Sequence, residues 1–172
     1  PESKFWNWAD AVGVNDSRFP KDERPVMDIS HPAMAVNLDA CINCNLCVRA
    51  CREIQVNDVI GMAGRGHHEQ IIFDFNDPMG DSSCVACGEC VQACPTGALM
   101  PSTLLDHAQK RTEYADRTVD SLCPFCGVGC QLTYHIKDDK ILHVTGKDGP
   151  ANHARLCVKG RFGFDYAHHP DR

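Results

Sequence analysis

The sequence lacks several features that would indicate other kinds of protein. It has no Lys- or Arg-rich run, and its 172 residues carry a net charge of −6, so we do not expect a nucleic-acid partner. No apolar stretch approaches the roughly 20 residues that a membrane span needs. The start shows no basic segment, apolar run and cleavage site of a secretory leader. Position 1 is Pro1 instead of Met, which predicts a piece of a longer chain.

Familiar catalytic groupings are missing as well. None of the nine histidines stands at a His-x3-His or Cys/His spacing, and no Ser/His/Asp triad or carboxylate pair stands out. We therefore expect the histidines at the surface or in structural hydrogen bonds. His107, in the segment between two cysteine groups, is the first to be tested for proximity to a metal centre.

Cysteine, in contrast, occurs twelve times, and eight of these residues form two runs of the same spacing. The runs are Cys41-x2-Cys44-x2-Cys47-x3-Cys51 and Cys84-x2-Cys87-x2-Cys90-x3-Cys94, the second followed by Pro95. Each cysteine of the second run lies 43 residues after its counterpart in the first. An internal duplication of this kind is typical of a bacterial-type ferredoxin with two 4Fe–4S clusters, which transfers single electrons.

The spacing also predicts which cysteines share a cluster. In two-cluster ferredoxins the fourth cysteine of each run binds the cluster of the other run. Cluster A is then held by Cys41, Cys44, Cys47 and Cys94, and cluster B by Cys84, Cys87, Cys90 and Cys51. Arg52 stands where the first run could carry a proline, which leaves the ligand set intact. Disulfides and zinc are the alternatives, but thiols this close in the chain make a poor disulfide framework, and zinc sites normally pair two Cys-x-x-Cys knuckles.

The remaining cysteines form a third group, Cys123-x2-Cys126-x3-Cys130 with Cys157 further on. Their context runs from Leu122-Cys123-Pro124-Phe125-Cys126-Gly127-Val128-Gly129-Cys130 to Leu156-Cys157-Val158-Lys159-Gly160-Arg161. Over residues 118–168 this resembles the N-terminal 4Fe–4S domain of molybdenum or tungsten bis-pterin oxidoreductases. The resemblance implies a cluster C on these four cysteines and Lys159 as an electron-transfer relay between that cluster and a pterin, as a cation beside anionic cofactors. Gly127 and Gly129 would let backbone amides approach the cluster. Zinc on four structural cysteines is the alternative for this group.

The first run extends the resemblance. Its segments Ala35–Cys44 and Cys47–Gln55 are similar to the ferredoxin region of the alpha subunit of soluble, NAD-dependent formate dehydrogenases. Related hydrogenase subunits carry that region too, but without the motif of residues 118–168. The resemblance implies a downstream domain holding bis-molybdopterin guanine dinucleotide with molybdenum or tungsten, where formate is oxidised. It also implies further iron–sulfur centres and a flavin subunit that reduces NAD as partners.

The twelve cysteines are all assigned to three clusters, which leaves none for molybdenum. We therefore expect this chain to be the electron-transfer part of the enzyme, without its active site. Another bis-pterin oxidoreductase, such as a nitrate reductase or a ferredoxin-linked formate dehydrogenase, could use the same relay. A free-standing ferredoxin-type carrier is a further alternative, which the tail Phe162–Arg172 disfavours because it resembles the start of something larger. The cluster chemistry indicates a reducing compartment, the cytoplasm.

The predicted architecture is α+β. It comprises an extended lead-in (1–34), a duplicated two-cluster ferredoxin-like domain (35–101), a linker helix (102–117) and a β-rich 4Fe–4S domain (118–172). The helix is expected over 102–116 under a Ser102 cap. Strands are expected at Ala35–Asp39, Val59–Met62, Gln70–Phe75, Thr96–Leu99 and Thr118–Leu122, and at Gln131–Lys137 and Lys140–Thr145 around an Asp138-Asp139 turn.

Overall fold

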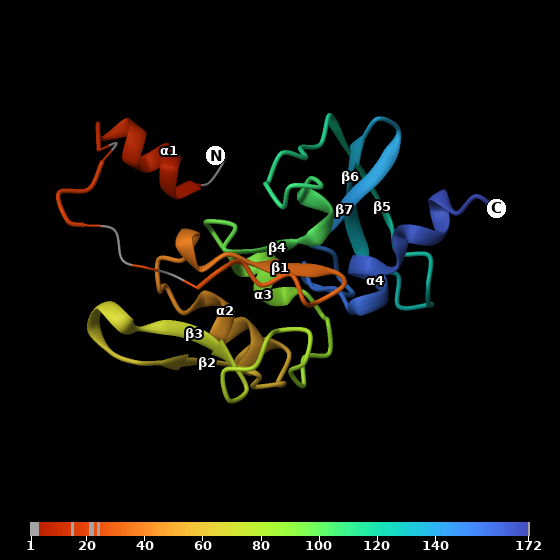
Figure 1. The fold of residues 1–172 in the computed structure, drawn as a ribbon. Coiled ribbons are helices and arrows are strands. Elements are labelled where there is room, and N and C mark those ends of the chain that lie inside the picture. The colour runs from red at the N-terminus through yellow and green to blue at the C-terminus, as the bar shows by residue number, and fades with distance from the viewer. Residues whose placement is uncertain (1–3, 15, 21–22, 24, 172) are drawn as a thin grey trace. The chain divides into compact units, whose positions relative to one another are not determined.

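The computed structural model describes residues 4–14, 16–20, 23 and 25–171 and shows a small mixed α/β protein (Figure 1). The chain divides into two compact units. The first runs to Cys84 and adds Cys90–Met100, and the second combines Val85–Glu89 with Pro101–Arg172. Within the described part of the chain, no helix is both long and apolar enough to cross a bilayer.

The first unit is built from short elements that alternate with the cysteine loops. After helix α1 (Lys4–Ala11), its elements in chain order are β1 (Met34–Val36), η1 (Leu38–Ala40), α2 (Leu46–Arg49), the π-helical η2 (Ala50–Ile54), β2 (Ile60–Ala63), η3 (Gly66–His68), β3 (Gln70–Phe73), α3 (Glu89–Ala93) and β4 (Leu99–Pro101). Strand β1 pairs with β4, and β2 pairs antiparallel with β3, with Ile60 opposite Phe73. Each run of cysteines is thus followed by a strand that returns to pair with another.

Local backbone conformation repeats with the cysteine spacing. Helices α2 and α3 begin at Leu46 and Glu89, which are 43 residues apart, as the cysteines are. The loops that precede them adopt left-handed conformations at equivalent positions: φ is +53° at Asn43 and +56° at Ala86, and +61° at Asn45 and +72° at Gly88. Left-handed residues turn a chain sharply, so both loops can point several backbone amides and thiols toward one centre.

The end of the lead-in is fastened to the first unit by one carboxylate. Asp28 Oδ2 accepts the backbone N–H of Met79 at 2.6 Å, and Oδ1 accepts that of Ser30 at 2.8 Å. Burial raises the pKa of Asp28, but hydrogen bonds from Ser30 and Met79 outweigh it, so this pKa lies below its usual value. Asp28 also bridges β1 through its backbone, opposite Val36.

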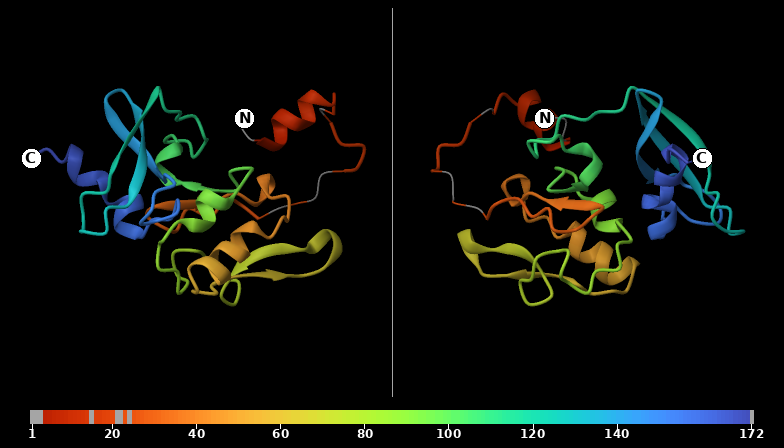
Figure 2. Two further views of the ribbon diagram at one scale, coloured as in Figure 1. Left: turned by 180° about the vertical axis from the view of Figure 1, so that it is seen from behind. Right: turned by 45° about the vertical axis from the view of Figure 1, so that its right-hand side comes forward.

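The second unit is a three-stranded antiparallel sheet accompanied by short helices. The strands are β5 (Arg117–Leu122), β6 (Gln131–Lys137) and β7 (Lys140–Gly146). The helices are η4 (Ser102–Leu104), α4 (Val158–Phe162) and η5 (Gly163–His168). The strand order is β5-β6-β7, and the strands form one twisted sheet (Figure 2). Asp138 and Asp139 both have positive φ between β6 and β7, as a two-residue type I′ hairpin turn requires. The core of this unit contains Leu132, Val144, Leu156 and Phe164, with Cys123 and Cys130 packed against it.

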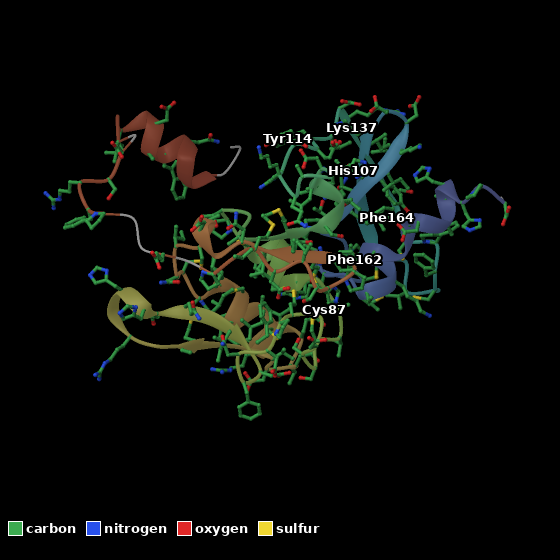
Figure 3. The ribbon with its side chains drawn as sticks, viewed as in Figure 1. Cys87, His107, Tyr114, Lys137, Phe162 and Phe164 are labelled. Carbon is green, nitrogen blue, oxygen red and sulfur yellow. The ribbon has the colours of Figure 1, made fainter. Side chains whose placement is uncertain are left out.

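The predicted linker helix over 102–116 is wrong. Only Ser102–Leu104 form a short 3-10 helix, after which Leu105 makes a β-bridge with Arg111. Between them, the Asp106 carboxylate accepts the N–H groups of Ala108 at 2.8 Å and Lys110 at 2.9 Å. An aspartate that bonds nearby backbone amides offers the chain a turn in place of a helix. His107 lies in this turn and is exposed (Figure 3).

Candidate metal centres

Four of the predicted ligands line one pocket of the first unit. Cys41, Cys44 and Cys47 come from the loop before α2 and its first turn, and Cys94 follows α3 in the second run. The pocket is otherwise mostly apolar, with Ile42, Ile71, Ala98 and Leu99 among its lining residues. The fold therefore brings the fourth cysteine of the second run to the first three of the first run.

The electrostatics of this pocket suit a positively charged occupant. Burial, followed by the neighbouring thiols of Cys41 and Cys94, raises the pKa of Cys47 to about 12. Four thiolates can share such a pocket only if a cation offsets their mutual repulsion. Thiolates are the ligands of 4Fe–4S clusters, and binding to the metal removes their protons. The donor set and its apolar surroundings therefore fit an iron–sulfur cluster.

Backbone amides donate to the sulfur atoms of three cysteines. The N–H of Val59, just before β2, donates to Cys51 Sγ at 3.4 Å, and that of Leu99, the first residue of β4, donates to Cys94 Sγ at 3.5 Å. The fourth cysteine of each run is thus capped by the strand that follows it. Asn43 N–H donates to Cys41 Sγ at 3.5 Å in the same way. Hydrogen bonds of this type stabilise negative charge on sulfur and help to set the reduction potential of a cluster.

The predicted ligands of cluster B are Cys51, Cys84, Cys87 and Cys90. Cys51 and Cys90 are buried, and Cys84 and Cys87 are half-buried. Three of these residues belong to the first unit, and Cys87 belongs to the second. A shared cluster on these four thiols stays a prediction.

The third group of cysteines surrounds the start of the sheet in the second unit. Cys123 follows β5, Cys130 precedes β6, and the backbone N–H of Cys123 donates to the Cys130 carbonyl at 2.8 Å. Cys157 is the N-terminal cap residue of α4. Burial and then the thiols of Cys123, Cys126 and Cys157 raise the pKa of Cys130, which places all four within electrostatic reach of each other.

Aromatic and glycine residues hold this cysteine loop against α4. The ring of Phe125 makes an edge contact with Tyr166, with 5.7 Å between ring centroids. A Cβ at Gly163 would lie 2.7 Å from the Phe125 ring, and a Cβ at Gly160 would lie 3.5 Å from Cys123 Sγ. A Cβ at Gly160 would make an ordinary contact, but the absence of a side chain at Gly163 lets the start of η5 approach the Phe125 ring closely.

Lys159 lies in the first turn of α4, two residues after Cys157, and is exposed. The predicted relay role of Lys159 stays a prediction.

Sequence reasoning missed Asn152, which organises the third group. Its side-chain Oδ1 accepts the N–H of Gln131 at 2.9 Å, and its Nδ2 donates to the carbonyls of Gln131 at 2.9 Å and Arg155 at 3.0 Å. Asn152 is only 8% exposed. It thereby ties the residue after Cys130 to the chain that leads into Cys157. Its place after Gly149-Pro150 signalled a turn but not these bonds.

A buried ion pair in the second unit was also missed. Arg161 Nη2 lies 2.6 Å from Glu89 Oε1, and the side chains are 2% and 6% exposed, respectively. Arg161 Nε also donates to the carbonyl of Cys87 at 2.8 Å. Nothing in the sequence pairs an acid at one cysteine run with a base 72 residues later.

No disulfide joins any of the twelve cysteines, all of which lie in the described part of the chain. Over the described ranges, no three His, Cys, Asp or Glu side chains converge closely enough to hold a single metal ion.

Two regions of the chain are similar in sequence to known protein families. Residues 40–98 match the family of the 4Fe-4S dicluster domain, and residues 116–169 match that of the molybdopterin oxidoreductase Fe4S4 domain. A "Putative formate dehydrogenase" of Staphylococcus haemolyticus is 29% identical over 99% of this chain and 21% of its own length. The NADPH-Fe(3+) oxidoreductase subunit alpha of Geobacter sulfurreducens is 36% identical over 87% of this chain and 17% of its own length. The chain thus spans about a fifth of these relatives.

A solved structure shows the same similarity in three dimensions. A chain of an NAD+-reducing [NiFe]-hydrogenase in the H2-reduced state is 28% identical, covers 63% of this chain and 45% of itself, and superimposes with a TM-score of 0.51. The chain thus carries a region that matches the 4Fe-4S dicluster domain, followed by a region that matches the Fe4S4 domain of molybdopterin oxidoreductases.

Proposed function

We propose that the chain is an electron relay of three 4Fe–4S clusters. Their ligand sets are Cys41/Cys44/Cys47/Cys94, Cys84/Cys87/Cys90/Cys51 and Cys123/Cys126/Cys130/Cys157. The observation that carries the proposal is the pocket that joins Cys94 to the three cysteines of the other run. When bound, such clusters supply one-electron redox chemistry. The chain's own contribution is to gather the thiols, screen most of them from water and donate N–H groups to their sulfur atoms.

The duplicated ferredoxin arrangement is part of the same proposal. The recurrence of helix starts and left-handed residues at the cysteine spacing supports it. The proposed domains are the lead-in (1–34), the ferredoxin-like domain (35–101) and the β-rich 4Fe–4S domain (118–172), with 102–117 as an irregular connection. The reducing chemistry favours the cytoplasm.

The relay is proposed to connect a molybdopterin site that oxidises formate with iron–sulfur and flavin centres that reduce NAD. The staphylococcal relative supports the formate end, and the NAD+-reducing hydrogenase supports the NAD end. The twelve cysteines are fully used by three clusters, so a pterin-bound molybdenum or tungsten would belong to an adjoining domain. Lys159, exposed at the start of α4, faces that domain in this proposal and relays electrons as a cation beside the pterin.

A second function is a relay in an NADPH-linked oxidoreductase. The Geobacter subunit favours it, because its identity with this chain is higher than that of the staphylococcal protein, at 36% against 29%. The cysteines would hold the same clusters, and only the electron donor and acceptor would differ.

Metal analysis of anaerobically purified chain tests the relay. Three clusters predict about twelve irons and about twelve acid-labile sulfides per chain, with the broad visible absorption of iron–sulfur proteins. A Cys94→Ser variant should lose about four irons, because one cluster then lacks a ligand. Zinc without sulfide would overturn the proposal.

Reduction of the clusters in the full-length protein separates the two candidate functions. Formate should bleach the cluster absorption if the formate proposal holds, and NADPH alone should do so under the second. Lys159→Ala should slow reduction by formate but leave the iron content and reduction by dithionite unchanged. An unchanged rate with formate would remove the role of Lys159.

A further inference from the structure

Arg161 makes hydrogen bonds to the carbonyl oxygens of two cysteines from different groups. Its backbone N–H donates to the carbonyl of Cys157 at 3.0 Å. Its side-chain Nε–H donates to the carbonyl of Cys87 at 2.8 Å. One residue therefore links a proposed ligand of cluster B to a proposed ligand of cluster C, and all three residues lie within the second unit.

Glu89 fixes the guanidinium in this position. Its Oε1 lies 2.6 Å from Arg161 Nη2 and also accepts the backbone N–H of Leu156 at 3.2 Å. Leu156 directly precedes Cys157, so the same carboxylate holds the start of α4. A planar guanidinium can bond two acceptors at fixed angles, which a lysine ammonium cannot do. Burial of both charges adds to the specificity of this geometry, because neither group has water as a substitute partner.

Gly88 is what lets the Arg161 side chain reach Cys87. A Cβ at Gly88 would lie 2.1 Å from Arg161 Cδ and 2.8 Å from Phe162 Cζ, and the φ of +72° also favours glycine. The equivalent position in the first cysteine run is Asn45, and the equivalent of Glu89 is Leu46, which is 40% exposed. The acid and the glycine thus occur only in the run that meets Arg161.

We propose that Arg161, held by Glu89, is a positioning residue that fixes the separation of Cys87 and Cys157 and thereby the coupling between the two clusters they bind. The inference rests on the proposed function for those clusters. The step between them moves one electron: one cluster is oxidised by one electron, the other is reduced by one, and no bond or proton changes place. Arg161 takes no part in the redox change itself and acts through the two ligand residues.

The variants are chosen to separate positioning from folding. Arg161→Gln leaves the buried Glu89 carboxylate with only Arg155 Nη1, 3.9 Å away, as a cationic neighbour and should lower the melting temperature by about 10 °C. Arg161→Lys keeps the positive charge but loses the planar guanidinium that bonds two acceptors at once. A double variant, Glu89→Met with Arg161→Met, replaces the pair by apolar side chains of similar length and should recover most of that melting temperature. Arg117→Gln is the matched control, because it breaks an ion pair of 2.7 Å with Asp139 whose side chains are 58% and 91% exposed.

The main measurement is electron paramagnetic resonance of the dithionite-reduced 172-residue chain, with iron counted on the same samples. Wild-type protein and Arg117→Gln should show the splitting between reduced clusters B and C, which is identified as the part of the spectrum that a Cys157→Ser variant lacks. The double variant should keep about twelve irons but lose that splitting, and Arg161→Lys should show it broadened or reduced. A double variant with full iron and an unchanged splitting would overturn the positioning role and leave the relay intact.

Hydrogen exchange gives a second readout that does not depend on the magnetic interaction between the clusters. The Leu156 amide should exchange about tenfold to a hundredfold faster in the double variant than in wild type, because its carboxylate acceptor is gone. The same amide should be unaffected in Arg117→Gln. Equal protection of Leu156 in the iron-loaded wild type and double variant would contradict the proposal.

Discussion

Single polar side chains that bond the backbone decide where the cysteines lie. Asn152 is the clearest case, because its amide bonds chain segments on both sides of the third group of cysteines. A buried amide that satisfies several backbone groups stabilises a loop more than its size suggests, since each group left unpaired carries a desolvation cost. The carboxylate of Asp28 does the same for the lead-in of the first unit.

Removal of the Asn152 amide should release the Cys157 segment. We expect Asn152→Ala to lower the free energy of unfolding by about 3 kcal/mol and to reduce the iron content by about one cluster in three. Asn152→Asp, which keeps the acceptor for Gln131 N–H but loses both donors, should fall between wild type and Asn152→Ala. Urea unfolding and iron analysis of the three proteins check this. An alanine variant with wild-type stability and full iron would contradict it.

At the scale of elements, alternation and turn chemistry predicted the second unit well. Strand β6 has the predicted limits, and β7 extends only one residue beyond them. The Asp138-Asp139 turn is confirmed, because aspartate tolerates the positive φ that a two-residue hairpin needs. Ala35–Asp39 was predicted as a strand, but β1 ends at Val36, because Asn37 caps a 3-10 helix by accepting the Asp39 N–H at 3.1 Å.

Hydrogen bonds from backbone amides to a side chain also replace the helix predicted over 102–116. Helical spacing of leucines and alanines was present, but Asp106 bonds two amides inside the segment and Gln109 has a φ of +60°. Propensity is a weak guide where a side chain competes for backbone amides. Local sequence patterns therefore predicted the β6–β7 hairpin correctly but predicted the wrong structure for residues 102–116.

The paired strands β6 and β7 bring two imidazoles together. His135 and His143 stack with 4.0 Å between ring centroids and an interplanar angle of 11°. Burial, followed by the proximity of His135, Arg111 and Arg161, lowers the pKa of His143 to about 3. Burial also lowers the pKa of His135. Both rings are therefore neutral in the folded chain at neutral pH.

This pair should make the chain less stable in mild acid. Below pH about 6.5 the unfolded chain takes up a proton at His143 while the folded chain does not, so stability should fall by up to about 1.4 kcal/mol per pH unit until pH about 3. His143→Phe keeps a stacked ring but cannot titrate, so its stability should depend less on pH. Urea unfolding at pH 7.5 and 5.5, with cluster absorbance followed in parallel, measures the difference. Identical pH dependence of the two proteins would count against a buried neutral His143.

At the scale of the whole molecule, cysteines contribute to the interior of each unit. Cys47, Cys51 and Cys90 are buried in the first unit, and Cys123 and Cys130 pack against the core of the second. Sulfur atoms that hold a cluster replace part of the apolar core that a larger domain would have. The clusters are then structural as well as functional.

Removal of iron should therefore unfold the chain. We expect chelation under reducing conditions to lower the free energy of unfolding by several kcal/mol, because metal binding to preformed thiolate sites contributes to folding. Circular dichroism at increasing chelator concentration should show secondary structure lost together with iron. Iron-free chain that keeps the same spectrum and melting temperature would show that the apolar core alone suffices.

The ligand chemistry was visible in the sequence, whereas the surroundings of the ligands were not. The likeness to two-cluster ferredoxins predicted that Cys94 would join Cys41, Cys44 and Cys47; these four line one pocket, and their binding of one cluster stays a prediction. The contacts of Asn152 and of Glu89 with Arg161 depend on tertiary structure, since their partners lie far away in the chain. Spacing encodes which atoms bind a metal, but long-range polar bonds appear only when the chain is folded.

The pocket shared by Cys94 and the first run also has a consequence for biosynthesis. A ribosome adds about 5 to 20 residues per second, and Cys94 is 47 positions beyond Cys47. Translation of Cys94 therefore follows that of Cys47 by about 2 to 10 seconds. A nascent chain in this interval presents an open set of three thiols that can lose or exchange metal. The proposed cluster A can then be closed only after Cys94 has been translated, near the end of the first domain.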